Sequence, residues 1–171
     1  MDPIEIVDYD PSWPAQFAEI ARRVRAACAD GPPITIEHVG STSIPGLAAK
    51  PVIDLNVVVS ARGDVPNAIA RLAELGYVHE GDKGVPGREA FLWPPGTRRH
   101  HLYLCLCDNT EHRRHVAFRD YLRENPDEAQ RYEALKRDLA ARFRDDRTAY
   151  SEGKTEFVEA MLEKVRASEG E

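Results

Sequence analysis

The sequence lacks long apolar runs and is poor in cysteine. Its 171 residues include three cysteines, too few to predict a disulfide framework that would replace a hydrophobic core. No stretch is long and apolar enough to span a membrane. The first residues, Met1-Asp2-Pro3-Ile4-Glu5, do not have the basic and apolar segments of a secretory signal. These absences predict a cytoplasmic protein with no membrane partner.

An excess of basic residues is also absent. The net charge is −6 and the pI is about 5.6, whereas a surface that binds DNA or RNA usually carries a basic excess. Nucleic acid is therefore disfavoured as the main partner, and a protein partner stays open. One local basic cluster is expected beside the loop described below, from Lys50, Arg88, Arg98 and Arg99.

Hydrophobic periodicity predicts an α+β protein with a mixed β-sheet, flanking helices and a helical C-terminal segment. The expected strands are 4–7, 34–39, 51–59, 77–79, 89–93 and 99–107, with residues 94–97 as the turn of a hairpin. Helices are expected from Asp10-Pro11 to about residue 28, at 65–75, and in three segments after Asn109, the first ended by Asn125-Pro126. We expect residues 1–108 to form a sheet domain, and residues 109–171 to pack on it in one compact unit.

Polar residues follow one apolar strand and lie within the next between Ile36 and Val59. A Gly40-Ser41 turn and small residues follow the first strand, and a turn of this kind can present backbone N–H groups and hydroxyls to a phosphate. In the second strand, Asp54 and Asn56 lie two residues apart and share a face, where both could ligate one cation. The loop is not a Walker motif, because Gly46 is followed by Leu-Ala-Ala-Lys. The spacing predicts a site for a nucleoside triphosphate, and a solvated strand end is the simpler alternative.

In the strand 99–107, alternation places His101, Tyr103, Cys105 and Cys107 on one face. A zinc site built from His101 and the two cysteines is disfavoured, because side chains of one short strand splay too far to enclose a tetrahedral ion. A half-buried strand that faces a cleft is the preferred interpretation.

The spacing from Gly40 to Asp54 resembles the nucleotidyltransferase signature of the DNA polymerase beta superfamily. Several further motifs resemble the GrpB family, which has a similar fold, over roughly residues 3–166. They are His38–Ser43, Pro45–Asp54, His101-Leu102, Phe118–Arg123, and Tyr150 with Gly153-Lys154. The chain departs from the nucleotidyltransferase pattern at Asn56 and His101, where that pattern has acids. Domains related to GrpB are also found fused to dephospho-coenzyme A kinase.

The resemblance implies a nucleotidyltransferase-like site for Mg²⁺ and ATP or another nucleoside triphosphate. Asp54 and Asn56 would bind the metal, and Asp54 and His101 would be the catalytic residues. The phosphate-binding residues would be Gly40, Ser41, Thr42, Ser43, Lys50, Tyr150 and Lys154. The acceptor-binding residues would be His38, Arg88, Trp93, Tyr103, Arg119 and Arg123, although Arg119 and Arg123 also suit a solvated helix face.

Three functions remain open at this point. The first is transfer of a nucleotidyl group from the triphosphate to a small-molecule acceptor. The second is a catalytically degenerate module that binds a nucleotide or a coenzyme A-like ligand and serves a partner protein; the missing acids favour it. The third is a transferase or ligase of a specialised pathway that reuses the phosphate site.

Overall fold

The computed structural model describes residues 2–171 and contains one five-stranded mixed sheet. The strands are β1 (Ile34–Val39), β2 (Ile53–Val59), β3 (Val78–His79), β4 (Arg88–Leu92) and β5 (His100–Leu106). Their order in the sheet is β1-β2-β5-β4-β3. The central pair, β2 and β5, is parallel, and the other pairs are antiparallel. The expected mixed sheet and its β4–β5 hairpin are confirmed.

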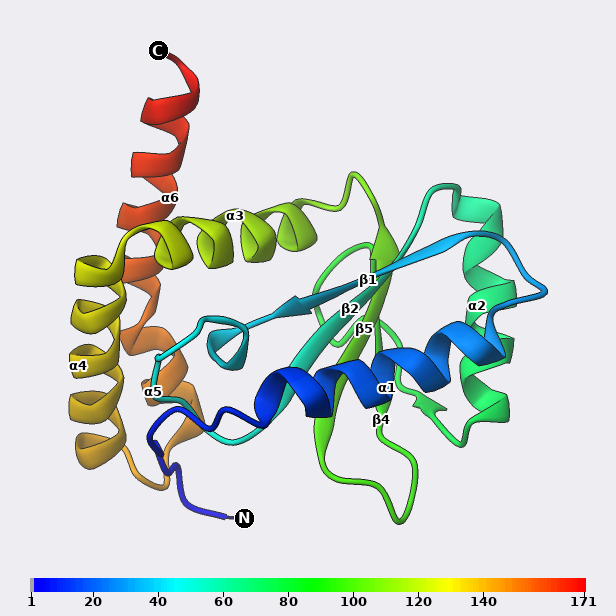
Figure 1. Ribbon diagram of the computed structural model, residues 1–171, viewed down its shortest axis with the longest axis horizontal. Coiled ribbons are helices and arrows are strands. Elements are labelled where there is room, and N and C mark those ends of the chain that lie inside the picture. The colour runs from blue at the N-terminus through cyan, green and yellow to red at the C-terminus, as the bar shows by residue number, and fades with distance from the viewer. Residues whose placement is uncertain (1) are drawn as a thin grey trace.

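Two helices, α1 (Trp13–Ala27) and α2 (Val65–Glu74), cover one face of this sheet (Figure 1). The main core lies between these layers, because alternate residues of β2 and β5 point toward the helices. Ile53, Leu55, Leu102 and Leu104 are almost completely buried there, against residues such as Val24 of α1. In the predicted strand 51–59, alternation places Ile53 and Leu55 on the face opposite Asp54 and Asn56, and this arrangement is confirmed in β2.

The last third of the chain is helical and lies at one end of the sheet (Figure 1). It contains α3 (Thr110–Glu124), α4 (Pro126–Arg142), α5 (Arg147–Gly153) and α6 (Thr155–Glu169). A second core joins Leu122 and Met161 of these helices to Ile44 and Leu47, which belong to the loop between β1 and β2. The helical segment thus packs directly on that loop. Within residues 2–171, no helix is long and apolar enough to cross a membrane.

Three local predictions were wrong. Residues 4–7 form no strand, and Val7 makes only an isolated bridge to Ala49. The first helix begins at Trp13, because the Asp10 carboxylate accepts a hydrogen bond of 2.8 Å from the Ser12 N–H and holds the preceding residues in a turn. Three helices were expected after Asn109 and the structure has four, because α5 forms a separate short helix that meets α6 at Lys154.

Candidate functional site

Asp54 and His101 form the centre of the candidate site. The parallel register places them directly opposite each other on β2 and β5, on the face of the sheet that does not carry the main core. The His101 Nδ1–H donates a hydrogen bond of 2.7 Å to Asp54 Oδ1. Since a carboxylate only accepts, the bond fixes the proton on Nδ1 and leaves Nε2 of neutral His101 as a proton acceptor.

The loop after β1 packs against this carboxylate. Gly40 has φ 74° and ψ −179°, a conformation that side chains disfavour, and a Cβ atom there would overlap Asp54 Oδ2. A short 3₁₀ helix, Ser41–Ser43, follows, and the Ser43 hydroxyl donates to the Gly40 carbonyl at 2.5 Å. Glycine at this position therefore allows the hydroxyl-bearing loop to touch the acid of the neighbouring strand.

A cavity of about 360 Å³ opens between this loop, the start of the sheet and the C-terminal helices. It unites residues that are distant in the sequence, and eight residues of the predicted site line it. They are Gly40, Ser41, Thr42, Lys50, Asp54, His101, Tyr150 and Lys154. The predicted proximity of the loop, the acid and the helical segment is thus present in the fold.

Three lysines give this cavity its charge. Lys50, Lys136 and Lys154 all line it, although the chain has only five lysines. Lys50 and Lys154 flank the ring of Tyr150, with Nζ 5.1 and 4.5 Å from its centroid. Burial and the neighbouring ammonium groups lower the pKa of Lys136 to about 7, and burial and Lys50 lower the pKa of Lys154 to about 8. Such a cluster suits an anionic ligand.

Lys136 was missed by the sequence predictions. It is only 2% exposed, and its Nζ donates to the carbonyl of Ala48 at 2.5 Å. A signal was present, because Lys136 shares the helical phase of Tyr132, Leu139 and Ala140, which are all buried on α4. A lysine in the apolar phase of a helix is a candidate for a buried functional cation.

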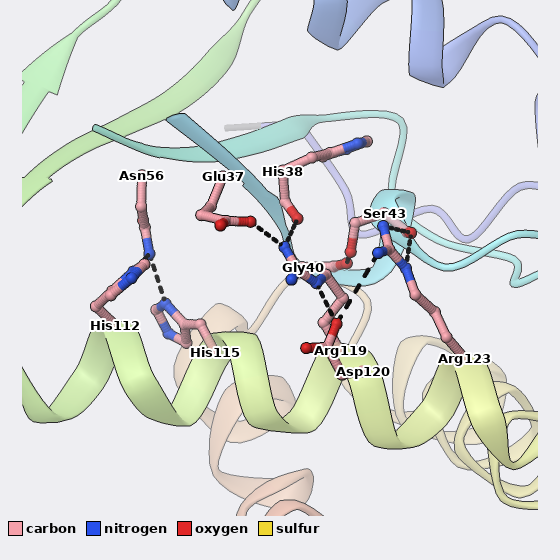
Figure 2. A network of polar contacts seen from close by, with 10 residues as sticks. All are labelled: Glu37, His38, Gly40, Ser43, Asn56, His112, His115, Arg119, Asp120 and Arg123. Carbon is pink, nitrogen blue, oxygen red and sulfur yellow. Dashed lines mark hydrogen bonds and ion pairs between the residues drawn. The ribbon is translucent and has the colours of Figure 1, made fainter. Parts of the chain in front are cut away.

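Asn56 does not take the predicted place beside Asp54. It is 2% exposed and does not line the cavity. Its Nδ2 donates to His112 Nδ1 at 3.1 Å and lies 3.5 Å from His115 Nδ1, so α3 engages the amide (Figure 2). This geometry does not support a metal-binding role for Asn56.

Arg119 and Arg123 hold α3 against β1 and the following loop (Figure 2). Arg119 donates to Glu37 Oε2 at 2.6 Å and to the His38 carbonyl at 3.0 Å. Arg123 donates twice to the Ser43 carbonyl, at 3.0 and 2.7 Å. Neither side chain lines the cavity. These contacts indicate that the two arginines position the Gly40–Ser43 loop, and they do not support the predicted contact with an acceptor.

The other predicted acceptor residues also lie outside the cavity lining. His38 stacks on Phe17 with ring centroids 4.6 Å apart and is hydrogen-bonded to Thr42 Oγ1 at 2.9 Å; burial lowers its pKa to about 4. Arg88 stacks over the Tyr103 ring at 4.3 Å. Trp93 lies under the guanidinium of Arg99. Each therefore has a packing role, while Ser43 supports the loop from a buried position.

The donor set fits one Mg²⁺ ion that arrives with a polyphosphate. Magnesium is commonly held by one or two carboxylates together with substrate phosphates, and Asp54 Oδ2 is the carboxylate oxygen not bonded to His101. The set does not fit two metals held by three acids. Across residues 2–171, no group of three or more acidic, histidine or cysteine side chains could hold an ion.

A second cavity, of about 550 Å³, lies between α1 and the β4–β5 turn. Its floor includes Ile20, Ile53, Leu75 and Tyr77. Ile53 and His100 point into it while their neighbours Asp54 and His101 point the other way. It is larger than the lysine-lined cavity, but it is mainly apolar and contains none of the predicted site residues, so we place the candidate site in the lysine-lined cavity.

The comparisons with known proteins point to one family. A family model described as GrpB protein matches residues 3–164. A UPF0157 protein of Pseudomonas aeruginosa is 39% identical over 98% of this chain, which spans 69% of that protein. The UPF0157 protein YqkA of Bacillus subtilis is 36% identical over 95% of this chain, which spans about half, 47%, of its length.

Two solved structures define the fold. The conserved protein GrpB from Enterococcus faecalis superposes with a TM-score of 0.84 and 35% identity, over 98% of this chain and 100% of that one. The Cid1 poly(U) polymerase, in a structure with Mg and 3′-dATP bound, has a TM-score of 0.55 and 12% identity over 80% of this chain and 44% of its own. The fold is therefore that of the nucleotidyltransferases.

Proposed function

The chain belongs to the GrpB family, and from this membership and the lysine-lined cavity we propose that it binds a nucleoside triphosphate with Mg²⁺ and transfers the nucleotidyl group to a small-molecule acceptor. The Gly40–Ser43 loop, Lys50, Lys136 and Lys154 would hold the phosphates. Asp54 would ligate the metal ion that accompanies them, which neutralises phosphate charge when bound.

One observation carries this proposal: a chain of net charge −6 gathers three of its five lysines in a single cavity beside a Gly-Ser loop. Backbone N–H groups, hydroxyls and ammonium groups are the donors that bind phosphates. The fold is also similar to that of Cid1, a poly(U) polymerase whose structure has Mg and 3′-dATP bound.

His101 would be the general base of the transfer. An acceptor hydroxyl would lose its proton to Nε2, its oxygen would bond to the α-phosphorus, and the bond from that phosphorus to the bridging oxygen would break. The pyrophosphate would leave with the electron pair of that bond. Asp54 binds the opposite nitrogen, at 2.7 Å, and would orient the imidazole and stabilise the imidazolium that forms.

A panel of nucleotides, with and without Mg²⁺, tests the binding by thermal shift, because a ligand of the folded state raises the melting temperature. We expect Mg·ATP or another Mg·nucleoside triphosphate to raise it, and Asp54→Ala to reduce the rise. Lys164, an exposed lysine of α6 that pairs with Glu128, offers the control variant Lys164→Met. Equal shifts for wild type and Asp54→Ala would contradict the proposal.

The single carboxylate at the metal position favours a second candidate, a non-catalytic module that binds a nucleotide or a coenzyme A-like ligand for a partner protein. Pyrophosphate release separates the two. Release from any of the four nucleotides in the presence of a pool of hydroxyl, amine and carboxylate acceptors supports transfer. Tight binding without release across that pool supports the module. A transferase or ligase that reuses the phosphate site for other chemistry would release phosphate or AMP with its own acceptor.

A further inference from the structure

We propose that Lys50, Lys136 and Lys154 supply the positive charge that a second metal ion supplies in two-metal sites, so that the cavity binds a chain of three or more phosphates without Mg²⁺. The inference rests on the proposed function and deepens it, because it assigns the neutralisation of the phosphate charge to the lysines. It also names a ligand class, linear polyphosphates and the nucleotides that end in them.

The argument begins with the charges that face the lysines. Three carboxylates lie near them: those of Asp54 and Glu111, which line the cavity, and that of Glu133. Glu111 pairs at 3.4 Å with Arg114, which also lines the cavity. The Asp54 carboxylate already accepts the His101 N–H. Glu133 accepts the Ala48 N–H at 3.1 Å and pairs with Arg137 on the surface of α4. The local acids are thus partly used, and the cavity keeps an excess of positive charge.

The lysines also have unused donors. An ammonium group has three N–H donors. Lys136 uses one of them, toward the Ala48 carbonyl, and its Nζ lies 4.9 Å from the centroid of Tyr132. The ammonium groups of Lys50 and Lys154 make no hydrogen bond or ion pair with another described residue; their recorded partner is the face of Tyr150. Both side chains are half-buried, so their N–H donors remain open to the acceptors of a ligand.

Two arginines add positive charge near Lys50. Arg99 and Arg147 lie close enough to Lys50 to act on its charge, and the Nε atoms of both arginines are buried without a partner in the part of the chain described. Mutual repulsion among such cations destabilises the free protein. A polyanion would remove the repulsion and fill the unused donors, whereas one small anion would reach only some of them.

The charge count argues against a second Mg²⁺ in this cavity. Two-metal sites rely on acids that hold both ions, and here His101 lies at the register position opposite Asp54 while Asn56 is bound by α3. A second divalent ion would meet ammonium groups and too few carboxylates. The phosphate oxygens that a second ion would bind can instead accept hydrogen bonds directly from Lys136 and Lys154.

Calorimetric titration of the full chain with inorganic tripolyphosphate in EDTA tests the inference. We expect binding in EDTA, within about tenfold of that with Mg²⁺, and much weaker binding of single phosphate. Lys136→Met and Lys154→Met should each weaken binding roughly 10- to 100-fold, as expected for lost charge-assisted bonds, whereas Lys164→Met should bind like wild type. Lys154→Arg keeps the charge and should retain most of the wild-type affinity. It serves as the second test variant if the methionine variants do not fold.

The outcomes separate this inference from the proposed function. No binding of tripolyphosphate in EDTA, or equal affinities for the Lys154→Met and Lys164→Met variants, overturns the inference. If Mg·ATP still binds in that case, the proposed function stands alone. Binding of tripolyphosphate but of no nucleoside triphosphate would support the lysine site and overturn the proposed function.

Discussion

Asp54 and His101 are paired twice in this protein, once by the backbone register of β2 and β5 and once by a hydrogen bond of 2.7 Å between their side chains. The strands place the two Cα atoms side by side, and the bond then selects the tautomer of the imidazole. An acid and a base are thereby held in a cavity that three lysines also line.

The variant His101→Ala should separate chemistry from binding. It removes the general base and leaves the lysines and the phosphate loop in place, so the affinity for Mg·nucleoside triphosphate should stay within about threefold. Pyrophosphate release should fall about 10²- to 10⁴-fold, the usual contribution of a positioned base. Both are measurable on one protein sample by calorimetry and a coupled assay. Unchanged release would remove His101 from the catalytic role.

The variant Gly40→Ala should damage the site and the fold together. The added Cβ meets the Asp54 carboxylate at a backbone conformation with φ 74°, which should cost about 1–3 kcal/mol of unfolding free energy. The displaced carboxylate should also weaken Mg-dependent binding. Urea denaturation measures the first effect and calorimetry the second. The variant Gly46→Ala is a matched control, since its φ is also positive, 81°, but nothing lies within 4 Å of its Cβ.

The variant Arg119→Met should loosen α3 from the sheet. Arg119 is 8% exposed and bonds to Glu37, Asp120 and the His38 carbonyl. Removing it leaves acceptors unpaired, and we expect a loss of about 2–4 kcal/mol of unfolding free energy. The control variant Arg142→Met removes an exposed arginine that pairs with Asp138 at 3.2 Å and lies over the Phe143 ring, and it should lose less than about 0.5 kcal/mol. Equal losses in urea denaturation would contradict the positioning role.

The affinity for polyphosphate should increase as the pH falls from 9 to 7. Lys154 and Lys136 have pKa values lowered to about 8 and about 7, so they gain their charges across this range and then attract the anion. Binding should raise both pKa values and take up protons. Titrations in buffers of different ionisation enthalpy measure that uptake. An affinity that is constant or decreases toward pH 7 would contradict the assignment.

The same pKa shifts make the stability of the free protein depend on pH, in the direction opposite to that of the affinity. Lys136 has its pKa lowered from 10.5 to about 7 in the folded state, so between these values the unfolded chain binds more protons. The free energy of unfolding therefore rises with pH through this window, as far as Lys136 contributes. Saturating ligand should flatten the trend.

The strands and the site centre could be predicted because local patterns determine them. Residues 34–39 alternate and become β1 at the predicted bounds, and alternation correctly placed Ile53 and Asp54 on opposite faces of β2. The loop at Gly40 was recognisable because its Gly-Ser turn precedes Asp54 at the spacing of the nucleotidyltransferase signature. These features depend on residues close together in the sequence.

The distant partners could not be predicted in the same way. Nothing near Asn56 in the sequence indicates that α3 will bind its amide, since His112 lies 56 residues away. Arg119 looked like a surface or acceptor-binding residue because its carbonyl partner, His38, lies 81 residues away. The periodicity of α4 places Lys136 among its buried residues, but its partner could not be predicted, because the Ala48 carbonyl lies 88 residues away in the sequence.

A crystal structure of the chain with a non-hydrolysable ATP analogue and Mg²⁺ tests the central claim most directly. The account predicts electron density for the phosphates between the Gly40–Ser43 loop and Lys154, with the metal on Asp54 Oδ2. Density for the analogue in the cavity between α1 and the β4–β5 turn, with the lysine-lined cavity empty, would contradict it.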